Sequence, residues 1–161
     1  MRGYITVTNK QKEGFTIIEV VLVLAIAGLI FLVVFLALPA LQRSQRDTQR
    51  RSDVGRLATS ISNYQSNNRG AVPTTAANLT TLLNDYVRTA AADPFADPNG
   101  TDYTLTLSTV GATGAGTVPA NTMYYYTNAT CNGEAAVAST GARKVAVRVD
   151  LEGGGSFCQN N

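Results

Sequence analysis

Glu19 is an acidic residue set among apolar side chains, and its position is the strongest chemical signal in the chain. No other charged residue occurs between Glu13 and Arg43. A carboxylate at the centre of a membrane helix costs about 3 kcal/mol, and less near an end of the helix. An intramembrane carboxylate is therefore a candidate functional group. Thr16 is the only other polar side chain nearby, and it could hydrogen-bond to a helix carbonyl or to a chain terminus.

The apolar segment that follows Glu19 is long enough to cross a membrane. Residues 20–38 contain no polar side chain. As a helix they span roughly 29 Å, about the thickness of the hydrocarbon core. A core helix of a soluble protein would show a polar face, so we expect a membrane-inserted helix. Three interpretations of residues 1–41 remain open: a secretory signal peptide, a plain single-pass anchor, and a precursor that is cut near Gly14.

The run Gly14-Phe15-Thr16-Ile17-Ile18-Glu19, with the apolar segment behind it, resembles the processing signature of type IV prepilins. That family includes the pseudopilins of type II secretion. Its members lose a short basic leader to a membrane-embedded prepilin peptidase, which usually methylates the new N-terminus. The resemblance implies cleavage between Gly14 and Phe15 and N-methylation of Phe15. It also implies that Glu19, with Thr16, acts in assembly by meeting the terminal amine of its own or a neighbouring subunit.

The leader of residues 1–14 carries Arg2, Lys10 and Lys12 against Glu13, and this basic excess favours the cytoplasmic side. The whole chain has 13 basic and 11 acidic residues, so without the leader it is formally neutral. Net charge therefore gives no support for binding nucleic acid or acidic lipid.

Gly28 and Pro39 stand at helix-breaking positions within or next to the apolar segment of residues 15–41. The resemblance implies that helical hydrogen bonding between them is lost in the assembled filament. The alternative is that Gly28 is a small packing residue and Pro39 a modest kink.

Residues 42–70 predict an amphipathic continuation of the same helix. Apolar residues recur there at helical spacing, which predicts a face buried against a globular head. They are Val54, Leu57, Ala58, Ile61 and Tyr64. Four arginines lie at the start of this segment: Arg43, Arg46, Arg50 and Arg51. They form either a solvated helix surface or a set of ion pairs between subunits. Gly70 is a candidate C-cap.

Residues 71–161 predict a small head. A helix is expected at residues 78–87, and strands at 103–107, 123–127, 144–151 and 156–158. The fold class is therefore α+β, with a long N-terminal helix packed on a small antiparallel sheet, similar to the pilin fold.

Cys131 and Cys158 are the two cysteines of the chain. After export across a membrane, a disulfide between them is the expected state. Such a bond would tie down the C-terminus, as the cysteine-bounded loop of many pilins does. Two free thiols are the alternative.

Asp93, Asp97 and Asp102 loosely resemble the aspartate-proline loop of major pseudopilins, which can hold calcium. The alternative is that these residues form turns, and no other cofactor is expected.

Three Asn-X-Thr sequences, at Asn78, Asn99 and Asn128, are interpreted as chance in a head rich in Thr and Asn. The chain has no histidine and no nucleophile–base spacing, so an enzyme is not expected.

The sequence thus predicts a major-type pilin that forms a helical homo-oligomeric filament for adhesion, motility or DNA uptake. Its partners would be the prepilin peptidase, the assembly platform and motor, and inner-membrane lipid before assembly. Its location would be the inner membrane and then the extracellular pilus. The alternatives are a pseudopilin of type II secretion and a membrane-anchored extracellular binding module.

Overall fold

The computed structural model describes residues 14–88, 95–111 and 121–161. The chain divides into two compact units, Met1–Ala40 and Leu41–Asn161. The helical elements are α1 (Ile17–Asn67), α2 (Ala76–Leu82) and a π-helical turn η1 (Leu83–Val87). The strands are β1 (Thr104–Ser108), β2 (Thr122–Thr127), β3 (Ala129–Asn132), β4 (Ala135–Ala138), β5 (Val145–Asp150) and β6 (Ser156–Asn160).

The first unit consists of the start of α1, and its apolar side chains are exposed. Gly28 and Pro39 both lie inside α1, which continues through them in this structure. Proline removes one backbone donor, and a helix tolerates that loss with a local kink. Loss of helical bonding between the two residues in a filament stays a prediction.

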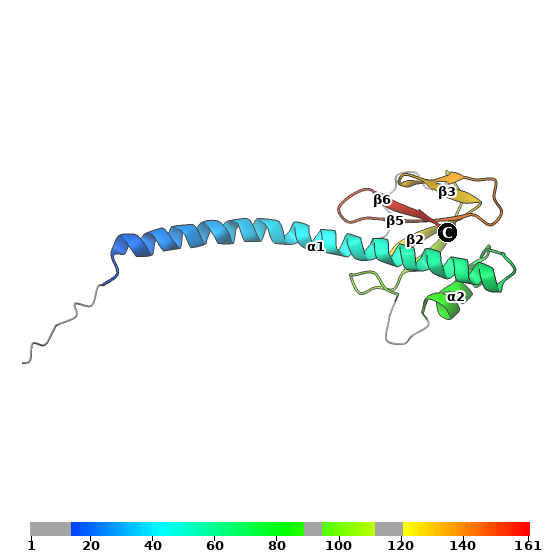
Figure 1. Cartoon of the computed structure of the whole chain (residues 1–161), viewed down its shortest axis with the longest axis horizontal. Coiled ribbons are helices and arrows are strands. Elements are labelled where there is room, and N and C mark those ends of the chain that lie inside the picture. The colour runs from blue at the N-terminus through cyan, green and yellow to red at the C-terminus, as the bar shows by residue number, and fades with distance from the viewer. Residues whose placement is uncertain (1–13, 89–94, 112–120) are drawn as a thin grey trace, which may run out of the picture. The chain divides into compact units, whose positions relative to one another are not determined.

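The second unit begins with the polar half of α1, and Figure 1 shows β2, β5 and β6 running alongside this half. The predicted apolar stripe is buried, with Leu57 and Ile61 fully inaccessible to solvent. Because the stripe recurs every three to four residues, one face of the helix covers the sheet while the other stays polar.

The end of α1 differs from the expected glycine cap by one residue. Arg69 takes the left-handed conformation with a φ of 57°. The Gly70 N–H then donates to the Gln65 carbonyl at 2.7 Å, the bond typical of a Schellman motif. Arginine therefore occupies the position where glycine is preferred, at a conformational cost.

The main sheet has the strand order β1-β2-β5-β6. β2 pairs antiparallel with β5, and β5 pairs antiparallel with β6, as predicted. β1 instead pairs parallel to β2, with Leu105 opposite Met123. A parallel pair needs a crossover of a dozen or more residues, and residues 109–121 are long enough to supply it. The α+β fold is confirmed, with a mixed rather than purely antiparallel sheet.

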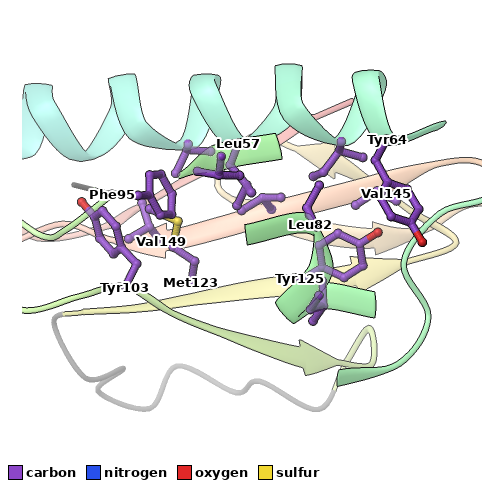
Figure 2. Close-up of a cluster of buried hydrophobic side chains, with 14 of the residues drawn as sticks. Leu57, Tyr64, Leu82, Phe95, Tyr103, Met123, Tyr125, Val145 and Val149 are labelled. Atoms are coloured by element: carbon purple, nitrogen blue, oxygen red, sulfur yellow. The ribbon is translucent and has the colours of Figure 1, made fainter. Parts of the chain in front are cut away.

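The core of the head lies between α1, α2 and the sheet (Figure 2). Leu57 and Tyr64 from α1 face Leu82 of the predicted short helix. On the sheet side, Met123 and Tyr125 of β2 complete this core layer. Alternate residues of β5 also point into it, because side chains of a strand alternate between the two faces.

The β3–β4 hairpin, which the sequence analysis missed, forms a second, two-stranded sheet. Cys131 of β3 and Cys158 of β6 form a disulfide with a Cα–Cα distance of 5.7 Å. The Cys131 N–H also donates to the Asn160 side chain at 2.5 Å. The hairpin and the C-terminal strand are therefore joined by both a covalent bond and a hydrogen bond.

Candidate functional site

The segment from Gly14 to Thr16 precedes α1 and is not helical. All three residues are exposed. A Cβ atom placed on Gly14 would meet no described atom within 4 Å, so the backbone is open to approach on this side. The peptide bond between Gly14 and Phe15 thus lies in an exposed, non-helical stretch just ahead of the helix. A protease needs its substrate in such a conformation, because helical hydrogen bonds would otherwise have to break.

Thr16 and Glu19 explain why the helix starts where it does. The Thr16 N–H and the Thr16 hydroxyl both donate to Glu19 Oε2, each at 2.8 Å. Thr16 precedes the first helical residue, and the Glu19 side chain, three residues later, accepts the Thr16 N–H, which is one half of a capping box. The partner predicted for Thr16 was a helix carbonyl or a chain terminus, whereas the structure pairs it with Glu19. The Thr-X-X-Glu spacing was the signal in the sequence that could have predicted this contact.

The apolar surface of residues 15–41 has no cover among the described residues. Phe15 is 90% exposed and Ile17 85% exposed. By length and composition alone, α1 can cross a membrane. Phe15, Glu19, Val20, Val23 and Leu24 border one open groove along this helix. A surface this apolar must be covered by lipid or by protein, because leaving it in water is unfavourable at about 25 cal/mol per Å².

In the head, two of the four clustered arginines form hydrogen-bonded ion pairs within their own chain. Arg46 binds Glu152 through two hydrogen bonds, at 2.7 and 2.5 Å. Arg50 is buried and contacts Asp97 at 2.7 and 3.0 Å and Asp47 at 2.9 Å. Neither a solvated surface nor pairing between subunits describes these two residues. Asp97 and Glu152 lie on loops far along the chain, so local spacing does not predict their pairs with Arg50 and Arg46. Asp47, the other partner of Arg50, lies on the same helix three residues before it.

The other two arginines remain more exposed. Arg43 lies 3.9 Å from Glu152, and its side chain is 60% exposed. Arg51 lies over the ring of Phe157, with 5.7 Å between its guanidinium carbon and the ring centroid. A cation held over an aromatic face contributes about 0.5–1 kcal/mol at an exposed site.

Asp47 joins the helix to the turn between β5 and β6. Its carboxylate accepts the backbone N–H groups of Glu152 and Gly153, both at 2.8 Å. Burial raises the pKa of Asp47, but these two N–H groups and Arg50 outweigh that effect and leave the pKa below its ordinary value. Asp97 raises the pKa of Arg50, and Arg46 lowers the pKa of Glu152 to about 2. Asp47, Arg50 and Glu152 therefore carry their charges at neutral pH.

The two calcium candidates that the structure describes are each held in an ion pair with an arginine. Asp93 lies outside the described residues. Both oxygens of Asp97 bind the Arg50 guanidinium, and Asp102 pairs with Arg88 at 3.2 Å. Within the described ranges, no group of three or more His, Cys, Asp or Glu residues could hold a metal ion. Calcium does not fit at Asp97, because a buried cation already neutralises that carboxylate.

Comparison with known families gives one match. Residues 9–35 match the family model of the prokaryotic N-terminal methylation motif, which is the prepilin-type signature of type IV pilins and pseudopilins. The matched range holds the Gly14–Phe15 bond, the Thr16–Glu19 cap and much of the apolar surface. No curated protein and no solved structure matches the chain.

Proposed function

We propose that this chain, which carries the prepilin-type signature, is the precursor of a major-type pilin of a type IV pilus. In this proposal a prepilin peptidase cuts between Gly14 and Phe15 and methylates Phe15. The observation that carries the proposal is the match at residues 9–35, together with a scissile bond that lies outside the helix. The mature subunit waits in the inner membrane until an assembly platform and motor extract it.

The assembled state would cover the apolar surface of residues 15–41. A second copy of α1 would supply this cover, because α1 presents apolar side chains on all sides here and can therefore pack against several neighbouring helices. In a filament core the Glu19 carboxylate would meet the Phe15 amine of a neighbouring subunit. That contact would replace part of the Thr16 cap and leave no unpaired charge in an apolar environment.

Two features of the head favour a pilus over a secretion pseudopilus. The Cys131–Cys158 disulfide ties down the C-terminal strand, in keeping with the resemblance to pilins. Asp97 is neutralised by Arg50, so it does not fit the calcium-binding loop of the major pseudopilins. Adhesion, motility and DNA uptake are the roles open to such a filament, and no residue described here favours one of them.

Mass spectrometry of filaments sheared from intact cells tests this proposal. A dominant N-terminal peptide that begins with methylated Phe15 is the expected result. Absence from the sheared fraction, with a processed Phe15 terminus in the inner membrane, would favour a pseudopilin instead. A chain that keeps residues 1–14 would favour a plain anchor that carries an extracellular binding module.

Variants of Glu19 distinguish two roles of this side chain, charge pairing in the filament and capping of the helix start. Glutamine can replace glutamate in a capping box, so Glu19→Gln should keep the helix start but lose the charge. We expect both Glu19→Gln and Glu19→Ala to reach the membrane and to be missing from sheared filaments. If Glu19→Gln assembles normally while Glu19→Ala does not, then capping and not charge pairing is the role of this residue.

A further inference from the structure

We propose that Asn99 is an acceptor site for an N-linked glycan. The head contains three Asn-X-Thr sequences, and the structure distinguishes among them. The proposal rests on the export proposed above, because an exported head would meet glycan transferases and their lipid-linked donors outside the cytoplasm. The Asn99 sequence differs from the other two in its exposure, in the position of its threonine hydroxyl and in the way its loop is anchored.

The Asn99-Gly100-Thr101 turn has the geometry of an acceptor sequence. All three residues are exposed. The Thr101 hydroxyl donates to Asn99 Oδ1 at 2.6 Å, and the Thr101 N–H donates to the same oxygen at 2.9 Å. Gly100 has a φ of 89°, a left-handed conformation that glycine adopts at low cost. The turn therefore bends so that the asparagine amide and the threonine hydroxyl stand together at the surface.

This arrangement prepares the Asn99 amide for transfer. Both donors act on Oδ1, and no hydrogen bond from Asn99 Nδ2 is found in the part of the chain that the structure describes. When Nδ2 gives up a proton, negative charge gathers on Oδ1, and the two donors from Thr101 stabilise that charge. The acceptor nitrogen itself stays free to approach an incoming sugar.

The sugar donor in this reaction is a sugar linked to a lipid pyrophosphate. Asn99 Nδ2 attacks the anomeric carbon and forms the new C–N bond. The bond from that carbon to the pyrophosphate oxygen breaks, and its electron pair leaves with the lipid pyrophosphate. A carboxylate of the transferase takes the proton from Nδ2. No oxidant or reductant is required.

The buried residue Asp97 fixes this turn to the head. Asp97 is 2% exposed and is fixed to α1 by its ion pair with Arg50. The Asp97 N–H donates to the Thr101 carbonyl, and the Gly100 N–H donates to the Asp97 carbonyl, both at 2.8 Å. The Asn99 N–H donates to Asp97 Oδ1 at 3.1 Å. These bonds fix the backbone from inside, so the acceptor geometry belongs to the folded head.

The other two sequences lack this geometry. Asn78 is half-buried on α2, and the hydroxyl of Thr80 donates at 3.1 Å to a backbone carbonyl of the same helix. Asn128 is exposed, but its φ is 51° and its threonine, Thr130, donates to the Asn160 side chain at 3.3 Å. In both cases the hydroxyl serves another acceptor. Exposure and hydroxyl placement coincide at Asn99.

Peptide-level mass spectrometry of the protein isolated from its own cells tests the proposal. We expect the mass of one or more sugar residues on the peptide that contains Asn99, and none on peptides with Asn78 or Asn128. Asn99→Gln and Thr101→Ala should lose the added mass, whereas Thr101→Ser should keep it. Thr130→Ala is the matched control and should change nothing.

A bare Asn99 in the isolated protein overturns the proposal, as does sugar at Asn78 or Asn128 instead. Retention of the sugar in Thr101→Ala overturns the role given to the hydroxyl. Circular dichroism of each variant checks that the head still folds. The same digest contains the N-terminal peptide, so failure of processing at Phe15 and failure of glycosylation are read separately.

Discussion

Replacing Arg50 with methionine should destabilise the head strongly. Arg50 is 3% exposed at its side chain, and the Asp97 side chain it contacts is completely buried. Methionine keeps most of the aliphatic packing but removes the cation. Asp97 would then be a buried carboxylate without its guanidinium partner. Removing one member of a buried ion pair costs about 3–5 kcal/mol, which is a large share of the stability of a typical domain.

Urea denaturation of the full chain in detergent measures this loss. The near-ultraviolet circular dichroism of buried tyrosines such as Tyr125 reports on the head. With an m-value of about 2 kcal/mol/M, a loss of 3–5 kcal/mol lowers the urea midpoint by about 1.5–2.5 M. The m-value should not change, because the same surface is exposed on unfolding.

Arg43→Met is the matched control on the same helix. Its side chain is exposed and lies at the limit of ion-pair distance from Glu152, so the expected loss is below about 1 kcal/mol. Adding Asp97→Asn to Arg50→Met removes the unpaired charge and should restore at least about 1.5 kcal/mol. The reasoning is refuted if Arg50→Met unfolds within about 1 kcal/mol of the wild type, or if the double variant is no more stable than Arg50→Met.

Three further predictions concern the same head. Arg46 lowers the pKa of Glu152 from 4.5 to about 2, so this ion pair stabilises fully above pH 4.5 and its contribution is lost as the pH falls toward 2. Urea midpoints measured across that range should fall, and Glu152→Gln should flatten the dependence; an unchanged slope would contradict the pairing. Replacing Cys131 and Cys158 with serine should cost about 3–4 kcal/mol of unfolding free energy. The non-reduced wild-type protein should weigh two hydrogens less than the reduced form, and equal masses would mean free thiols. Arg69→Gly should stabilise the head by about 0.5–1 kcal/mol in thermal or urea unfolding, because it relieves the left-handed conformation; a loss of stability would show that the arginine side chain contributes there.

Local signals in the sequence were sufficient for the helices and for most of the sheet. The apolar run at residues 20–38 predicts a membrane-compatible helix because every side chain in it is apolar. The stripe that includes Leu57 and Ile61 predicts the buried face of α1 because its spacing follows the helical repeat. The alternation in residues 145–151 predicts a strand packed on one face.

The direction of β1 and the β3–β4 hairpin escaped prediction for different reasons. Parallel or antiparallel pairing depends on how the chain returns across the sheet, and no local pattern in β1 records that path. Both hairpin strands are only four residues long, and β4 (Ala135–Ala138) consists mostly of alanine, which is depleted in strands. The hairpin is also joined to the distant strand β6 by the disulfide, a contact that no local pattern records.

The sequence alone determined the prepilin-type motif and the long apolar helix, because both depend on residues that are neighbours along the chain. Thr16 and Glu19 are one helical turn apart, so their contact follows from the helix itself. Only the tertiary structure decided the partners of Arg46 and Arg50, since Asp97 and Glu152 reach them only after the head has folded. It also separated Asn99 from two sequences of the same type. Exposure and hydroxyl placement are properties of the folded loop, and the three-residue motif does not contain them.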